Sequence, residues 1–265
     1  MTRLRAVLFD LHGTLIFSTR VFTREDYAAH LAERATPLVR AWGVDLDLRA
    51  LCRDLMGAIE AAWEIGMSEG RNVDCPFIVR GAFADRGVEI TDAQARLFWN
   101  AGRLPFADYA QLFPDTTDVL RALRDAGLRL ALVTNQPYPG DLLLPDLEAF
   151  RLRQWFDAIL VSHDVGHSKP HPVIFARALD ALGASPAEAI MVGDTPEIDV
   201  RGAKRVGMRA VLKRNGDRRR TMQGADYAID DLVELLELPC MPPGLAAARL
   251  APTPTPHEDD NEGRY

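Results

Sequence analysis

The sequence predicts an α/β protein built on a doubly wound parallel sheet, with a helical domain inserted after the first strand. From about residue 113 onward, short apolar segments alternate with helical patterns, which is typical of parallel strands joined by right-handed crossovers. Residues 17–108, by contrast, contain no convincing strand and have the periodicity of helices. We therefore expect an α/β core made of residues 1–16 and 109–238, a helical domain over 17–108, and a disordered tail over 239–265.

The composition indicates a globular, cytoplasmic chain. Its 265 residues are 48% hydrophobic and carry a net charge of -7, which argues against nucleic acid or an anionic membrane surface as a partner. Three cysteines, Cys52, Cys75 and Cys240, are too few and too scattered for a disulfide framework or a zinc site. The apolar run near Met1 is too short for a signal peptide, and no stretch approaches the roughly 20 apolar residues of a membrane span.

The first predicted strand ends on a carboxylate. The apolar run Ala6-Val-Leu-Phe9 leads directly into Asp10, and Gly13 then permits a sharp turn. Thr14 offers a hydroxyl back toward the carboxylate. Side chains at the carboxyl ends of parallel strands line the crevice where ligands bind, so we expect Asp10 to take part in chemistry rather than in core packing.

The inserted segment has the pattern of four helices. Apolar residues recur at helical spacing from Tyr27 to Trp42, from Leu48 to Trp63 and around Phe98. Turn signals separate these stretches, including one over residues 66–72, and Thr91 has the position of a helix N-cap. A helical block of this size can bury its own apolar stripe, which is why we expect a separate small domain.

The second half of the chain contains the remaining strands of the sheet and several polar residues at their ends. We expect strands over 128–134, 158–162, 189–194, 209–213 and 227–229, and helices over 115–126, 171–182 and 199–206. A doubly wound sheet brings the ends of these strands together. The polar residues that then converge with Asp10 are Thr134, Asn135, Lys169, Asp194 and Asp199.

This convergence predicts a site for a phosphate and a divalent cation. Three carboxylates, Asp10, Asp194 and Asp199, would repel one another unless a cation lay among them, and hard oxygen ligands suit Mg²⁺. Thr134 offers a hydroxyl and neighbouring backbone N–H groups to a phosphate oxygen. Lys169 adds a positive charge for a transferring phosphoryl group.

Four segments carry a resemblance to a known family. They are Asp10-Leu-His-Gly-Thr14, Val133-Thr-Asn135, Lys169-Pro170 and Gly193-Asp-Thr-Pro-Glu-Ile-Asp199, in order on successive strand ends. From about residue 5 to 215 the chain resembles the haloacid dehalogenase (HAD) superfamily, in its phosphoglycolate-phosphatase-like branch, which has a Rossmann-like core and a mobile helical cap.

The resemblance assigns a role to each residue. It implies that Asp10 is a nucleophile that forms an aspartyl-phosphate, that Thr134 and Asn135 hold the phosphate, and that Lys169 orients it. The same resemblance implies that Asp10, Asp194 and the backbone carbonyl of His12 bind Mg²⁺, with Asp199 in support.

His12 departs from the family pattern, which has an aspartate two residues after the nucleophile. In the family, that acid protonates the leaving group and then activates water. A histidine can do both because its reference pKa is about 6.5, and strand alternation would place His12 on the same cleft as Asp10. We therefore expect a catalytic His12.

Three functions are compatible with these residues. The first is a magnesium-dependent phosphatase acting on a small phosphorylated metabolite. The second is a carbon-centred hydrolase of the dehalogenase type, which Asp194 and Asp199 argue against because metal-free dehalogenases lack that motif. Phosphonate cleavage is disfavoured too, because its cap lysine is missing from residues 17–108. The third is a catalytically impaired phosphate-binding or interaction module.

Substrate selectivity is expected to come from the inserted helices. A turn over residues 66–72 could dip into the crevice when the helical domain closes, and Arg71 in that turn is the candidate for binding an anionic substrate.

Overall fold

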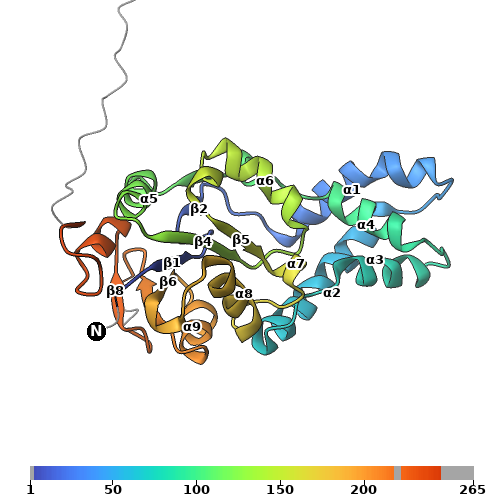
Figure 1. Cartoon of the computed structure of the whole chain (residues 1–265). Helices are drawn as coiled ribbons and strands as arrows, with labels where there is room; N and C mark the ends of the chain where they lie inside the picture. The colour runs from blue at the N-terminus through green and yellow to red at the C-terminus, as the bar shows by residue number, and fades with distance from the viewer. Residues whose placement is uncertain (1–2, 218–221, 246–265) are drawn as a thin grey trace, which may run out of the picture.

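The computed structural model describes residues 3–217 and 222–245, and at its centre is a six-stranded parallel sheet (Figure 1). Its strands are β1 (Ala6–Phe9), β4 (Arg129–Thr134), β5 (Ala158–Val161), β6 (Ala189–Gly193), β7 (Arg209–Lys213) and β8 (Tyr227–Ile229). The spatial order is β5-β4-β1-β6-β7-β8, so the chain first winds outward on one side of β1 and then on the other. This order confirms the predicted doubly wound α/β fold.

Both faces of the sheet are buried, which explains the uninterrupted apolar runs in its strands. Val7 and Phe9 of β1 belong to one apolar cluster, whereas Ala6 and Leu8 belong to the cluster on the opposite face. The helices that cover the first face are α5 (Thr116–Asp125) and α6 (Gly140–Ala149), together with the 3-10 segment η5 (Leu232–Glu237). The helices that cover the second face are α8 (Pro172–Leu182) and α9 (Arg201–Arg205).

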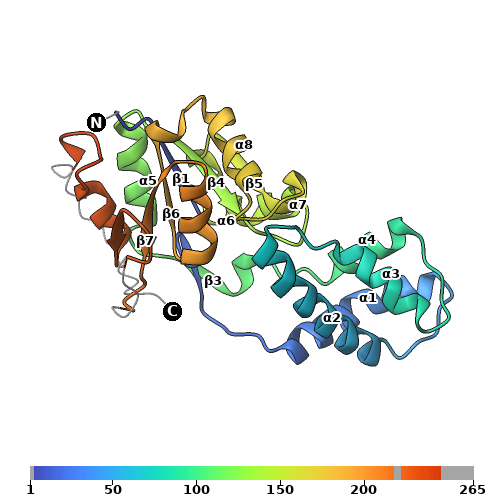
Figure 2. The same cartoon turned by 90° about the horizontal axis from the view of Figure 1, so that it is seen from below.

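Four helices between β1 and α5 form a second body, which we call the helical unit. They are α1 (Arg24–Ala41), α2 (Leu48–Glu69), α3 (Cys75–Ala84) and α4 (Asp92–Ala101). Figures 1 and 2 both show these helices gathered to one side of the sheet rather than stacked on it. The unit buries an apolar cluster of its own, in which Phe83 and Phe98 pack edge to face with ring centroids 5.1 Å apart.

Some elements differ from the sequence expectation. The short strands β2 (Ile16–Ser18) and β3 (Ala110–Leu112) form an antiparallel pair at the two junctions of the helical unit, where no strand was predicted. Three residues are too few to show an alternating pattern, which is why the sequence does not reveal them. The predicted turn over residues 66–72 is also too long, because α2 continues to Glu69 and ends on Gly70, whose φ is 70°.

The predicted tail begins too early in the sequence. Cys240, Met241 and Leu245 are buried in the same apolar cluster as Phe9, so residues 239–245 pack against the core rather than form a tail. The rest of the predicted tail, residues 246–265, lies outside the described residues. Across the described residues, every helix is too short or too polar to span a bilayer.

The separate cluster of the helical unit leads to a prediction for stability. Phe83→Ala removes a ring that is 0% exposed and should lower the free energy of unfolding by about 3–5 kcal/mol. Phe77→Ala is the matched control on the same helix, because its ring is 68% exposed and its loss should change stability by at most about 0.5 kcal/mol. Urea denaturation of both variants tests this, and equal losses would contradict the packing described here.

Candidate active site

Asp10 lies at the centre of the candidate site because it follows the strand that has neighbours on both sides. β1 pairs with β4 on one side and with β6 on the other. The backbone N–H of Asp10 donates to the carbonyl of Val192 at 3.0 Å, which continues the pairing with β6 by one step. The ends of the two flanking strands, with Thr134 and Asp194, therefore lie beside the Asp10 carboxylate.

Two glycines allow the carboxylates to approach one another. Gly13 has φ +82°, and a Cβ on it would lie 2.4 Å from Oδ2 of Asp194. A Cβ on Gly193 would lie 2.3 Å from Cγ of Asp199. Neither position can accept a side chain without displacing an acidic residue of the site.

Lys169 joins two of these carboxylates. Its Nζ donates to Oδ1 of Asp10 at 2.6 Å and to Oδ1 of Asp199 at 2.7 Å, while the side chain is only 2% exposed. Hydrogen bonds between charged groups are stronger than neutral ones, and removing one partner from a buried ion pair typically costs about 3–5 kcal/mol. Lys169 therefore fixes the relative positions of Asp10 and Asp199.

Asn135 holds the backbone of Lys169 in place. Its Nδ2 donates to the carbonyl of Lys169 at 3.0 Å, and its Oδ1 accepts from the N–H of Lys169 at 2.8 Å. Both ends of the amide thus contact the residue that carries the ammonium group. These contacts position the backbone of Lys169, and the predicted binding of substrate by Asn135 stays a prediction.

Asp199 belongs to a single turn of π-helix, Pro196–Val200, that follows β6. Its Oδ1 accepts from Lys169, and its Oδ2 accepts from the N–H of Thr195 at 3.0 Å. Since both oxygens accept a hydrogen bond, the orientation of the Asp199 carboxylate is fixed beside the other two acids. π-helical turns of this kind occur often at functional sites.

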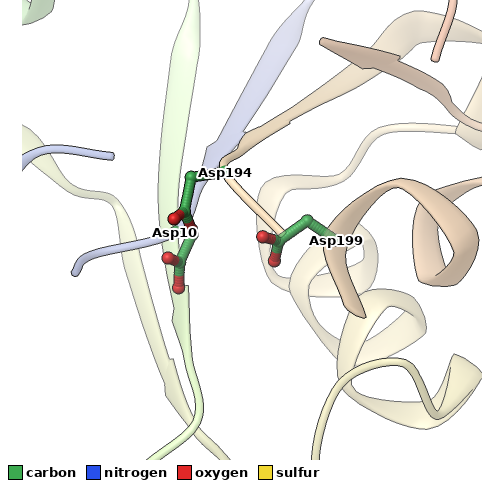
Figure 3. Close-up of side chains that lie close together, drawn as sticks. All are labelled: Asp10, Asp194 and Asp199. Atoms are coloured by element: carbon green, nitrogen blue, oxygen red, sulfur yellow. The ribbon is translucent and has the colours of Figure 1, made fainter. Parts of the chain in front are cut away.

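The three carboxylates together fit a divalent cation. One ligand oxygen from each of Asp10, Asp194 and Asp199 lies within 4.8 Å of the others, and Figure 3 shows the carboxyl group of Asp199 facing the other two. Lys169 supplies one positive charge against three carboxylates, and an excess of negative charge remains even with Lys213, which interacts with Asp194. Carboxylate oxygens are the ligands that Mg²⁺ prefers, so the residues present fit this ion.

The pKa values show that these buried groups act on one another. Burial raises the pKa of Asp10, and it raises the pKa of Asp199 to about 6, although Lys169 opposes both shifts. Burial by itself would lower the pKa of Lys169, but Asp10 and Asp199 outweigh it and raise that pKa. Lys169 is therefore charged at neutral pH and favours the ionised form of both acids.

Two threonines of the predicted motifs are buried near the strand ends. Thr134 is 2% exposed, and its Oγ1 accepts from Nε2 of Gln136 at 3.4 Å. The Oγ1 of Thr14 is buried and has no hydrogen-bond partner among the residues that the structure describes. The expectation that this hydroxyl contacts the Asp10 carboxylate is therefore wrong.

His12 follows Asp10 by two residues and has partners that the sequence does not suggest. Its Nε2 lies 2.7 Å from Oγ of Ser18 on β2, and its ring stacks on Phe106 with centroids 6.1 Å apart. The residue is exposed, yet desolvation of part of the ring lowers its pKa while Asp194 acts to raise it. A lowered pKa keeps more of the imidazole neutral near pH 7.

Arg71 is not brought into this cluster. Its guanidinium group is exposed and forms an ion pair with Glu69, so its predicted role in substrate binding stays a prediction. The neighbouring Asn72, which sequence reasoning missed, contacts the core instead, because its Oδ1 accepts from Oγ of Ser162 at 3.3 Å and from Oγ of Ser168 at 3.4 Å. No short-range sequence signal marks this contact, since about 90 residues of chain separate the partners.

Comparison with known proteins identifies similar chains. A family model described as haloacid dehalogenase-like hydrolase matches residues 4–207. A glyceraldehyde 3-phosphate phosphatase from Methanopyrus kandleri is 31% identical over 244 residues, which cover 89% of this chain and 97% of that protein. A ribulose-1,5-bisphosphate 5-phosphatase from Halopiger xanaduensis is 33% identical over 150 residues, which cover 53% of this chain and 60% of that protein.

A solved structure supports the same relationship. The crystal structure of a HAD phosphatase from Thermococcus onnurineus superposes with a TM-score of 0.57 and 30% sequence identity. The match covers 88% of this chain and 97% of that chain, so it includes the helical unit as well as the sheet.

The carboxylate cluster leads to a prediction for metal binding. Mg²⁺ at about 100 times its Kd should stabilise the native protein by about 2.7 kcal/mol, which raises its Tm by several degrees. Asp194→Asn should remove most of this Mg²⁺-dependent shift, because it replaces a charged oxygen ligand with a neutral amide. Differential scanning calorimetry with and without Mg²⁺ measures the shift.

The control for this experiment is Asp54→Asn, which changes an exposed carboxylate of the helical unit. It should leave the Mg²⁺-dependent shift unchanged. A full shift in Asp194→Asn would count against the cation site.

Proposed function

We propose that this chain, which belongs to the haloacid dehalogenase-like hydrolase family, is a magnesium-dependent phosphatase that uses Asp10 as its nucleophile. The observation that carries the proposal is the buried cluster in which Lys169 joins Asp10 and Asp199 beside Asp194. The phosphatase names of the relatives support the reaction type and suggest a small phosphorylated metabolite as substrate. The same carboxylate cluster argues against a metal-free dehalogenase.

In the first half of the reaction, an oxygen of Asp10 attacks phosphorus and the bond from phosphorus to the alcohol oxygen breaks. Lys169 acts to lower the pKa of Asp10 against the effect of burial, and its hydrogen bond to Oδ1 holds the carboxylate in one orientation. Thr134 lies at the end of the neighbouring strand, where a phosphate oxygen would be received. The product is an aspartyl-phosphate and an alkoxide that needs a proton.

The protonated form of His12, whose fraction near pH 7 is reduced by the lowered pKa, supplies that proton, and the neutral imidazole then takes one back. In the second half, water attacks phosphorus of the aspartyl-phosphate, inorganic phosphate leaves, and the Asp10 carboxylate is restored. His12, held through Ser18 and Phe106, accepts the proton of the attacking water. A proton thus enters and leaves the same imidazole in each turnover.

Mg²⁺ would neutralise charge on the transferring phosphoryl group. Asp10, Asp194 and the backbone carbonyl of His12 would hold the ion, and Asp199 would support it through Lys169. In this proposal the helical unit is a cap that covers the substrate and excludes water.

Replacement of Asp10 tests the nucleophile. Asp10→Asn keeps the size of the side chain but should abolish turnover, because an amide is not a competent nucleophile. The fold should persist, since Lys169 still pairs with Asp199. Release of inorganic phosphate and far-ultraviolet circular dichroism measure the two properties, and near wild-type turnover would rule out an aspartyl-phosphate.

Replacement of His12 tests the proton transfer. His12→Ala should lower the rate on an alkyl phosphate by about 10²–10⁴-fold, because the alkoxide leaving group needs a proton. An activated aryl phosphate, whose leaving group departs without help, should be nearly spared. His12→Asp restores the residue that the family pattern has and should be at least as active as His12→Ala.

The opposite result has a clear meaning. If His12→Ala matches wild type on the alkyl phosphate while His12→Asp raises its hydrolysis by orders of magnitude, the histidine is a defect rather than a catalyst. The chain would then be a catalytically impaired phosphate-binding module.

A further inference from the structure

A cavity of about 500 Å³ lies between the helical unit and the core. Its walls come from α1, α2 and α4, from residues 102–109 after α4, and from residues 136–138 after β4. This size is within the usual range for a pocket that holds a small organic molecule. The carboxylate cluster itself is not part of these walls.

Two residues connect the cavity with the candidate active site. Phe106 lines the cavity and also stacks on the ring of His12. Gln136 lines it too and donates to Oγ1 of Thr134. The cavity therefore adjoins the reaction centre on the side of His12, where the leaving group of a phosphate ester would lie.

The walls of the cavity are mainly aromatic and aliphatic. Tyr27 and Trp63 from the helical unit face it together with Phe106, Tyr109 and Tyr138. Such side chains favour an apolar ligand, since each 100 Å² of apolar surface removed from water contributes about 2.5 kcal/mol. Aromatic walls also favour stacking with an aromatic ring.

The aromatic wall is held by contacts across the two bodies. Trp99 of α4 stacks on Tyr138 with ring centroids 5.0 Å apart and planes inclined by 10°. The indole Nε1 of the same tryptophan donates to the carbonyl of Pro137 at 3.1 Å. This part of the cavity is thus preformed, which lowers the cost of binding.

The arginines of the cavity already have acidic partners. Arg24 pairs with Glu60, and Arg103 pairs with Asp146, which is 2% exposed. A ligand carboxylate would have to compete with these partners for a cation. The charge balance therefore favours a neutral leaving group over a carboxylated one such as glycolate.

We propose that the cavity binds the alcohol portion of the substrate, which is a phosphate monoester of a neutral, apolar alcohol with an aromatic ring. This inference rests on the proposed phosphatase function, because it assigns the cavity to the leaving group of that reaction.

Steady-state kinetics on three esters tests the substrate class. 2-Phenylethyl phosphate and ethyl phosphate both release an alkoxide, but only the first has a ring for the cavity, and phosphoglycolate adds a carboxylate. We expect kcat/KM to be at least about 100-fold higher for 2-phenylethyl phosphate than for ethyl phosphate, with no advantage for phosphoglycolate. 2-Phenylethanol should inhibit competitively at concentrations where ethanol does not.

Variants then locate the preference in the cavity. Trp63→Ala should lower the ratio of kcat/KM between 2-phenylethyl and ethyl phosphate by at least about 10-fold, because it removes an aromatic wall. Phe77→Ala, which removes an exposed ring outside the cavity, should leave the ratio unchanged. Inhibition of the wild-type enzyme by 2-phenylethanol gives a readout that does not depend on the folding of any variant.

The results distinguish a failure of the cavity assignment from a failure of the proposed phosphatase function. Ethyl phosphate or phosphoglycolate hydrolysed as well as 2-phenylethyl phosphate would overturn the assignment of the cavity and leave the phosphatase function standing. A preference that Trp63→Ala does not reduce would overturn the assignment as well. No phosphate release from any ester in the presence of Mg²⁺ would overturn both.

Discussion

The ion pairs of Lys169 are the interaction on which the site depends. One ammonium group, 2% exposed, joins a carboxylate after β1 to a carboxylate in the turn after β6, so it fixes two separate strand ends relative to each other. Without it, Asp10 and Asp199 would lie in a buried space as like charges, and the pKa values of both carboxyl groups would rise further. The chemistry proposed for Asp10 therefore requires Lys169 even before any substrate or Mg²⁺ is bound.

Backbone geometry makes this arrangement possible. A side chain at Gly13 would collide with Asp194, and one at Gly193 would collide with Asp199. Asn135 holds the backbone of Lys169 through hydrogen bonds to both its N–H and its carbonyl. These residues need not touch the reacting atoms to matter. They determine how closely the carboxylates approach one another, and closely spaced carboxylates favour the binding of a divalent cation.

The sheet and the helical unit contribute different parts of the proposed site. The sheet brings together the charged groups that we propose for phosphoryl transfer, whereas the cavity beside His12 is lined largely by the helical unit and the segments that join it to the core. Phe106 lines the cavity and stacks on His12, so a leaving group in the cavity would lie near the imidazole that is proposed to protonate it. In our proposal, the reaction and the choice of substrate are set by different parts of the chain.

The sequence by itself determined the fold class and the strand ends. Apolar runs such as those before Asp10 and Asp194 are continuous because both faces of the sheet are buried, and such runs can be recognised locally. The tertiary structure alone decided which groups meet: Ser18 with His12, both ends of Asn135 with Lys169, and Trp99 with Tyr138. It also paired β2 with β3, placed Arg71 on the surface and formed the cavity. Most of these features depend on contacts between residues far apart in the chain, and such contacts leave no periodic pattern in the sequence.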